Sequence, residues 1–250
     1  MAPIVMHSVI GERVYAQIEP LAQTQALGTF LLGCMLVDVN AFSDLDRRQT
    51  HFAGRPNEDG ENAFYEGTRT FLSQLNQLLR RPWPSLTPDE QAFVAGYLCH
   101  LAADEAWKST LWRALWAMGI TSADQFPIPG GVVLTAYSVL STQYYLDTAA
   151  VADALRQAAI PDVLTYLPHE ALVHMWRIVK PCAIEDFSAD CYLAMLERQG
   201  RTAAEVADRR RLHERYMDEA LAFIKGSFDV ETMIQATVDR SLQVVPALWP

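Results

Sequence analysis

The chain has 250 residues, and 50% of them are hydrophobic, so it can bury a substantial core and is not an intrinsically disordered polypeptide. Its 20 basic and 30 acidic side chains give a formal net charge of -10. Such a balance does not favour binding to duplex nucleic acid, which requires a basic face that neutralises phosphates.

Apolar residues at three-and-four spacing recur along the chain, and no convincing period-two run of β-branched residues appears. This periodicity predicts an all-α fold. The expected helices cover residues 7–19, 23–39, 60–80, 88–118, 130–158, 162–179, 185–199, 202–225 and 229–244. No composition shift requires a second domain, so residues 1–250 are expected to form one domain.

Local signals mark some of these boundaries clearly. Thr87, Pro88 and Glu90 are typical of a helix N-terminus, with an N-cap, a first-turn proline and a capping-box acid. Prolines and glycines at 127–131 predict a break. Residues 43–60 are polar and rich in turn formers, and they are expected to form a long loop with a functional role.

The first 25 residues lack the basic-then-apolar order of a signal peptide, and the apolar run Ala26–Val37 is too short to span a bilayer. The four cysteines have no CxxC spacing and lie in apolar segments, which predicts buried thiols: Cys34, Cys99, Cys182 and Cys191. Together these features predict a cytoplasmic protein with no transmembrane segment.

The strongest local motif is His100-Leu-Ala-Ala-Asp104, inside the helix expected at 88–118. Residues four apart share one helical face, so this imidazole and carboxylate can bind one cation. The segment is otherwise almost purely apolar, and a carboxylate buried there must be paired or bound to a cation. Gly96 lies one turn earlier and would let a second helix approach closely. The competing interpretation is an ordinary hydrogen-bonded His–Asp pair.

Three other candidate ligands lie upstream: His7 near the N-terminus, Asp38 at the end of an apolar run, and His51 in the polar segment. The order of these motifs resembles the bacterial zinc-dependent phospholipase C superfamily, whose wider relatives include single-strand-specific zinc nucleases. The resemblance covers about residues 1–120 and includes the Gly96–Trp107 segment. Residues 121–250 carry no recognised motif.

The resemblance implies a multi-helix orthogonal bundle of the phospholipase C and nuclease type. It also implies one or two zinc ions held by His7, Asp38, His51, His100 and Asp104. The trinuclear members carry a further histidine where this chain has Thr110. His169, Glu170 and His174 are candidates for additional metal or substrate contacts, although an ordinary amphipathic helix explains them as well. His213 lies among arginines and is expected on a solvated face.

Zinc with nitrogen and oxygen ligands activates water near neutral pH, so the expected function is a zinc-dependent phosphodiesterase or phospholipase C-like hydrolase. Asp38 is the expected ligand and general base. The expected substrate is a small-molecule or lipid-like phosphoester. The alternative is a non-catalytic or repurposed helical metal-binding protein. The tail from Leu242 to Pro250, with Trp249, is compatible with docking on the chain itself or with contact to a second copy in a homo-oligomer.

Overall fold

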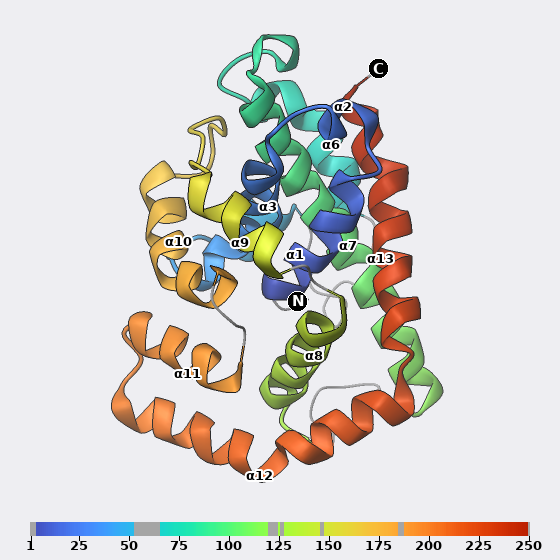
Figure 1. The fold of residues 1–250 in the computed structure, drawn as a ribbon, viewed down its shortest axis with the longest axis vertical. Helices are drawn as coiled ribbons and strands as arrows, with labels where there is room; N and C mark the ends of the chain where they lie inside the picture. The colour runs from blue at the N-terminus through green and yellow to red at the C-terminus, as the bar shows by residue number, and fades with distance from the viewer. Residues whose placement is uncertain are drawn as a thin grey trace.

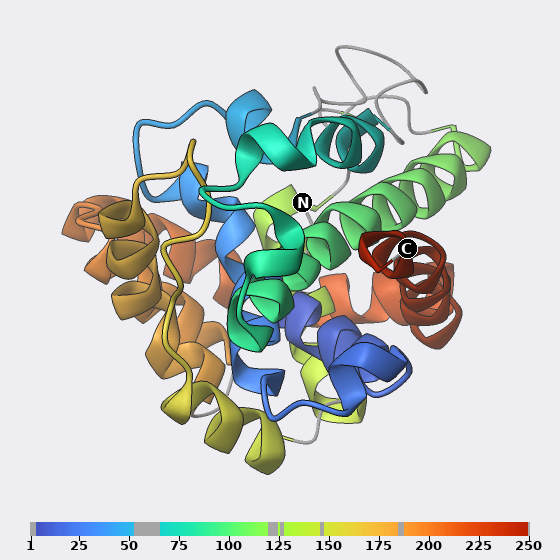
Figure 2. The same ribbon diagram turned by 90° about the horizontal axis from the view of Figure 1, so that it is seen from above.

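The computed structural model describes residues 4–52, 66–119, 125, 128–145, 148–184 and 188–249. Within these ranges the chain is helical and contains no strand, and extended segments pair only at an isolated bridge between Leu79 and Leu164. The predicted all-α, single-domain class is therefore confirmed. Helices α3 and α7 lie at the centre, and the other helices surround them at various angles (Figures 1 and 2).

The described α-helices and 3-10 helices follow one another in this order: α1 (Ile4–Tyr15), α2 (Glu19–Ala22), α3 (Leu27–Leu36), η1 (Val37–Ala41), α4 (Arg47–His51), α6 (Glu66–Leu78), η3 (Trp83–Ser85), α7 (Pro88–Ala117), α8 (Gly130–Tyr145), α9 (Thr148–Gln157), α10 (His169–Ile184), α11 (Ala189–Arg198), α12 (Ala203–Ser227), α13 (Val230–Val244) and η5 (Val245–Leu248). The capping box predicted at Thr87 and Glu90 is present at the start of α7.

Part of the segment expected as a loop is helical, so that expectation was wrong for α4. The Asp46 side chain accepts a hydrogen bond from the Arg48 amide at 2.6 Å, and the Gln49 side chain accepts one from the Asp46 amide at 2.9 Å. This reciprocal cap offsets the cost of starting a short helix in a polar sequence. Residues 53–60 of the predicted loop lie outside the described part.

Other helix boundaries also differ from the sequence prediction, most clearly in α8, α9 and α10. The single helix expected at 130–158 is two helices, α8 and α9. Helix α10 begins at His169 and not at residue 162, because the preceding segment is extended: the Arg80 amide donates to the Val163 carbonyl at 3.0 Å, and the Thr165 amide donates to the Leu78 carbonyl at 2.9 Å.

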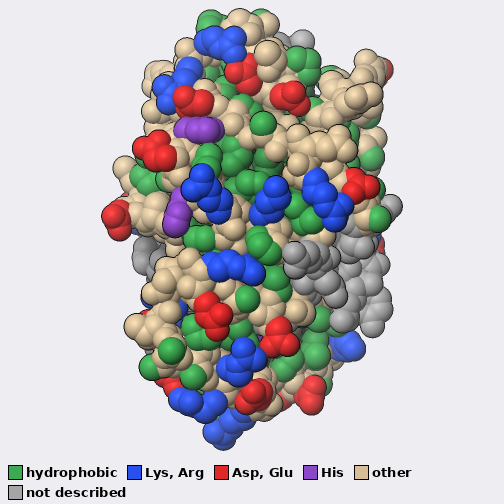
Figure 3. All heavy atoms as spheres, turned by 60° about the vertical axis from the view of Figure 1, so that its left-hand side comes forward, with side chains coloured by type: hydrophobic (Ala, Val, Ile, Leu, Met, Phe, Trp, Pro, Cys, Tyr) green, Lys and Arg blue, Asp and Glu red, His purple; other side chains and the backbone are tan. Residues whose placement is uncertain are grey.

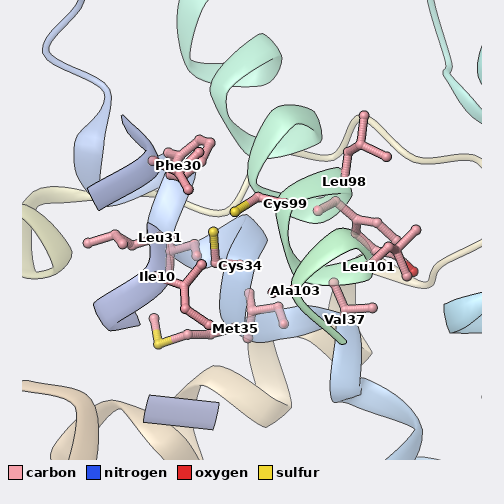
Figure 4. Packing of buried hydrophobic residues seen from close by; sticks show 14 of the residues in the cluster. Ile10, Phe30, Leu31, Cys34, Met35, Val37, Leu98, Cys99, Leu101 and Ala103 are labelled. Atoms are coloured by element: carbon pink, nitrogen blue, oxygen red, sulfur yellow. The ribbon is translucent and has the colours of Figure 1, made fainter. Parts of the chain in front are cut away.

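Helices α3 and α7 meet in close backbone contact, as the sequence predicted from Gly96. A Cβ atom built on Gly96 would lie 2.0 Å from the Phe30 carbonyl oxygen, and one on Gly33 would lie 2.1 Å from the Phe93 carbonyl oxygen. Only glycine fits at these two positions. The contact brings Cys34 and Cys99 together, and their sulfur atoms face one another between the helices (Figure 4).

The other two cysteines, Cys182 and Cys191, form a disulfide with a Cα–Cα distance of 5.6 Å. The expectation of four buried thiols was therefore wrong for this pair and holds for Cys34 and Cys99. The two disulfide partners lie near the end of α10 and the start of α11, so the bond links these two helices.

The C-terminal tail docks on the chain itself. The Trp249 ring packs edge-on against Trp83 at a centroid distance of 5.3 Å. Contact of this tail with a second copy stays a prediction. Among the described helices, none combines the length and apolar character needed to cross a bilayer. The cytoplasmic location expected from the sequence stays a prediction as well.

Candidate metal centre

The structure brings together all five residues that the sequence singled out as metal ligands, and we call this group the cluster. His7 comes from α1, Asp38 from the kinked η1, and His51 from the last turn of α4. His100 and Asp104 project from adjacent turns of α7. Four separate segments therefore supply the cluster, and their side chains are at most 2% exposed.

Ligand-type atoms in the cluster lie at short distances from one another. His51 Nε2 is 3.1 Å from Asp38 Oδ1 and 3.3 Å from His100 Nε2. His7 Nε2 lies 3.8 Å from Asp104 Oδ1, and its ring stacks on His100 at 3.8 Å. Zinc bonds of 2.0–2.1 Å separate tetrahedral ligand atoms by about 3.3 Å, so this spacing fits one coordination sphere.

A hydrogen bond to the backbone fixes the orientation of the His100 ring. Its Nδ1 lies 2.7 Å from the Cys34 carbonyl oxygen, which can only accept, so Nδ1 carries the proton. The lone pair of Nε2 then points into the cluster. This is the arrangement that orients metal-ligating histidines, and the close packing of α3 on α7 supplies it.

Three buried atoms of the cluster have no hydrogen-bond partner among the described residues: Nδ1 and Nε2 of His7, and Oδ2 of Asp38. His7, Asp38 and His100 each offer a ligand atom within 4.8 Å of the others. His51, His100 and Asp104 form a second such group. A buried acceptor without a partner is costly, and a cation bound among these atoms would remove that cost.

Burial keeps the three imidazoles neutral, which is the form that binds metal. It lowers the pKa of His7 to about 3, with His100 adding to the shift, and the pKa values of His51 and His100 to about 4. Burial alone would raise the pKa of Asp38, but His100 and His51 together hold it below its usual range. Both carboxylates are therefore ionised at neutral pH.

Two basic side chains that the sequence analysis did not single out contact the carboxylates. Arg47 Nη2 donates to Asp104 Oδ2 at 2.7 Å, and Arg47 Nη1 lies 3.5 Å from Asp38 Oδ1. Lys108 Nζ lies 2.8 Å from Asp104 Oδ2. Spacing could have identified both, because Arg47 precedes His51 by four residues and Lys108 follows Asp104 by four, which places each on the same helical face as its ligand.

The short helix α4 is held in place by contacts around His51. Thr50 Oγ1 lies 2.7 Å from His51 Nδ1, and the Tyr97 hydroxyl donates to the Thr50 carbonyl. Phe52 ends the helix in the left-handed region with φ 55°, and its ring packs against Phe71. These contacts fix where His51 points.

The other candidate residues lie apart from the cluster. His169, Glu170 and His174 are in the first turns of α10: His169 Nε2 contacts the Ile160 carbonyl at 3.0 Å, and the other two side chains are exposed. No described group of ligand atoms includes them. His213, expected on a solvated face, is buried, with Nε2 3.0 Å from Thr135 Oγ1.

On the face in Figure 3, lysine and arginine side chains are interspersed with acidic, polar and apolar ones. The expectation that the chain does not bind duplex nucleic acid stays a prediction.

Comparison with protein-family models, curated proteins and solved structures finds no match for this chain. The resemblance to zinc-dependent phospholipase C enzymes stays a prediction, as does the specific bundle type that it implies.

Proposed function

We propose that this protein is a metal-dependent hydrolase that holds zinc in the cluster and cleaves a phosphoester. One observation carries the proposal: buried ligand atoms of His7, Asp38 and His100 lie within 4.8 Å of one another, and both ring nitrogens of His7 and Oδ2 of Asp38 have no hydrogen-bond partner among the described residues. Buried polar atoms are nearly always paired, and a cation bound here would pair the acceptors among them.

The geometry favours one ion over two. Both groups of ligand atoms share His100, and its Nε2 has a single lone pair because Nδ1 is committed to the Cys34 carbonyl. A second ion would therefore lose a nitrogen ligand that the first already uses. When bound, zinc supplies Lewis acidity and lowers the pKa of a coordinated water to about 7. Ligand atoms of the cluster would hold it, including the carboxylates of Asp38 and Asp104.

The chain's own groups then have separate tasks. Asp38 Oδ2 is buried and has no partner among the described residues, so it is available to accept a proton from the attacking water. His100 is held in the ligating tautomer by the Cys34 carbonyl. Arg47 and Lys108 bring positive charge next to the cluster, which suits an anionic ester such as a phosphoester more than a neutral one.

A second candidate function is a structural metal site in a non-catalytic helical protein. It is favoured by the depth of burial, since the five cluster side chains are at most 2% exposed. Structural zinc sites are closed, whereas catalytic sites keep a position open for water or substrate. Under this alternative, zinc stabilises the fold and no phosphoester is turned over.

The test begins with elemental analysis of the full-length protein purified without added metal. We expect about one equivalent of zinc, with little in H100A and D38N. H169A is the matched control, because it removes an imidazole outside the cluster and should keep the zinc content of wild type. Wild-type protein that takes up no zinc, even after incubation with the metal, would overturn the proposal.

Hydrolysis of bis(p-nitrophenyl) phosphate and of short-chain phospholipids then separates the two candidates. We expect turnover that a chelator abolishes and added zinc restores, that D38N loses, and that H169A retains. Zinc-loaded protein that shows a raised melting temperature but no turnover of either substrate would favour the structural site.

A further inference from the structure

Arg47 and Lys108 contribute positive charge to the cluster. Arg47 contacts the carboxylates of both Asp38 and Asp104, and Lys108 contacts that of Asp104. The two bonds to Asp104 are short, at 2.7 and 2.8 Å. A divalent cation on the same carboxylates would therefore compete directly with Arg47 and Lys108 for Asp104.

Binding of that cation would add two positive charges to a buried site that already holds two basic side chains, which is costly unless an anion accompanies it. The two basic side chains are also the outermost groups of the assembly. Their side chains are 11% and 10% exposed, against at most 2% for Asp38 and Asp104. An anion that arrives from solvent therefore meets Arg47 and Lys108 before it meets the cluster.

We propose that Arg47 and Lys108 exchange partners: they neutralise Asp104 when the cluster holds no cation, and they bind a tetrahedral oxyanion such as phosphate once a cation has taken over the carboxylates. The guanidinium fork matches two oxygens of a phosphate, and the lysine adds a point charge. This inference rests on the proposed function and assigns these two residues to recognition of the substrate's phosphate group.

This exchange of partners predicts that removing Arg47 affects phosphate binding and zinc binding in different directions. Cation and anion become mutually reinforcing ligands, so phosphate tightens zinc binding by the factor by which zinc tightens phosphate binding. Removing Arg47 should weaken phosphate binding, because a charge-assisted contact is lost. The same change should leave zinc binding unchanged or make it stronger, because a competing cation has gone. A residue that only supports the fold would weaken both.

The experiment measures zinc affinity of the full-length protein by competition with a chromophoric chelator, with and without inorganic phosphate. The variants are R47M, R47K and K108M, with R80M as the matched control, since Arg80 forms an exposed ion pair with Asp162 away from the cluster. Phosphate should tighten zinc binding by about tenfold or more in wild type and R80M. The effect should be small in R47M and K108M and intermediate in R47K. Circular dichroism confirms that each variant is folded.

The outcomes separate this inference from the proposed function. Wild-type protein that binds no zinc refutes the proposed function and this inference with it. Wild type that binds zinc while phosphate has the same effect in R47M refutes the inference alone. Folded R47M and R47K that both lose zinc binding would show that Arg47 supports the cluster structurally, which also refutes it.

Discussion

The close contact of α3 with α7 makes Gly96→Ala the most informative single change in the scaffold. The added Cβ would lie 2.0 Å from the Phe30 carbonyl oxygen and 3.0 Å from the Cys34 amide nitrogen, whereas ordinary contacts begin at 3.4 Å. Both neighbours are backbone atoms, so neither can swing away by a rotamer change. The two helices must separate, or one of them must bend.

The magnitude follows from two opposing terms. Overpacking in a tight core costs about 1–3 kcal/mol and more where backbone must move. Alanine has a higher helix propensity than glycine, which stabilises the helix by about 1 kcal/mol and offsets part of this cost. Because the clash here is with backbone, we expect Gly96→Ala to lower the free energy of unfolding by about 2 kcal/mol or more. Metal content should fall too, because α3 leads into Asp38 and α7 carries His100.

Urea unfolding followed by circular dichroism measures the change, and Gly226→Ala is the matched control. A Cβ on Gly226 meets nothing within 4 Å, and this residue lies in the last turn of α12. The control should be neutral or stabilising by up to about 1 kcal/mol. If Gly96→Ala unfolds within about 0.5 kcal/mol of wild type, the close-contact reasoning is refuted.

Three further predictions concern the buried charges and the disulfide. The folded-state pKa values of the cluster histidines lie below the ordinary 6.5, so the unfolded chain binds more protons between pH 6.5 and about 4. The metal-free protein should therefore lose stability as pH falls through that window, by up to about 1.4 kcal/mol per pH unit for each histidine. Urea unfolding measures the free energy of unfolding at each pH, and a value that stays constant from pH 7 to 5 would contradict this prediction. Glu105→Ala should lower the free energy of unfolding by about 3 kcal/mol in thermal unfolding, because it removes the buried carboxylate that accepts from the Thr68 amide and lies 3.0 Å from Arg240. The zinc content of this variant should stay that of wild type. Equal losses of zinc and stability would show that Glu105 belongs to the site. Cys191→Ser should lower the unfolding free energy of the oxidised protein by roughly 2–3 kcal/mol through loss of a short covalent loop with Cys182, and an unchanged denaturation midpoint would contradict it.

Helix α7 shows how far local pattern alone can lead. Its N-terminus was predictable from Thr87 and Glu90, since capping depends on residues three apart. The shared face of His100 and Asp104 follows from helical geometry, and so does the use of Gly96 as a contact point. Helix α4 was missed because its polar sequence has no apolar periodicity, and the Asp46 cap that starts it is a weak signal on its own.

The disulfide and the break between α8 and α9 illustrate the opposite case. The sequence predicted that one helix ends at 179 and another begins at 185, but it does not say how these two helices pack, and their packing decides whether Cys182 and Cys191 can form a disulfide. The sequence from 130 to 158 has apolar spacing suited to one helix, whereas the structure has two, and α9 packs against α3 and α10. Both features depend on how a helix is buried against segments distant in sequence, and local helix propensity carries no information about that burial.

The sequence by itself determined that the chain is helical, that α7 places an imidazole and a carboxylate on one face, and that glycine permits a close neighbour there. Only the tertiary structure decided that His7, Asp38 and His51 lie beside His100 and Asp104. It also decided that Arg47 and Lys108 contact the carboxylates of the cluster. The physical reason is range: helical periodicity and capping act over a few residues, whereas the cluster depends on four segments whose positions are set by packing across the whole core.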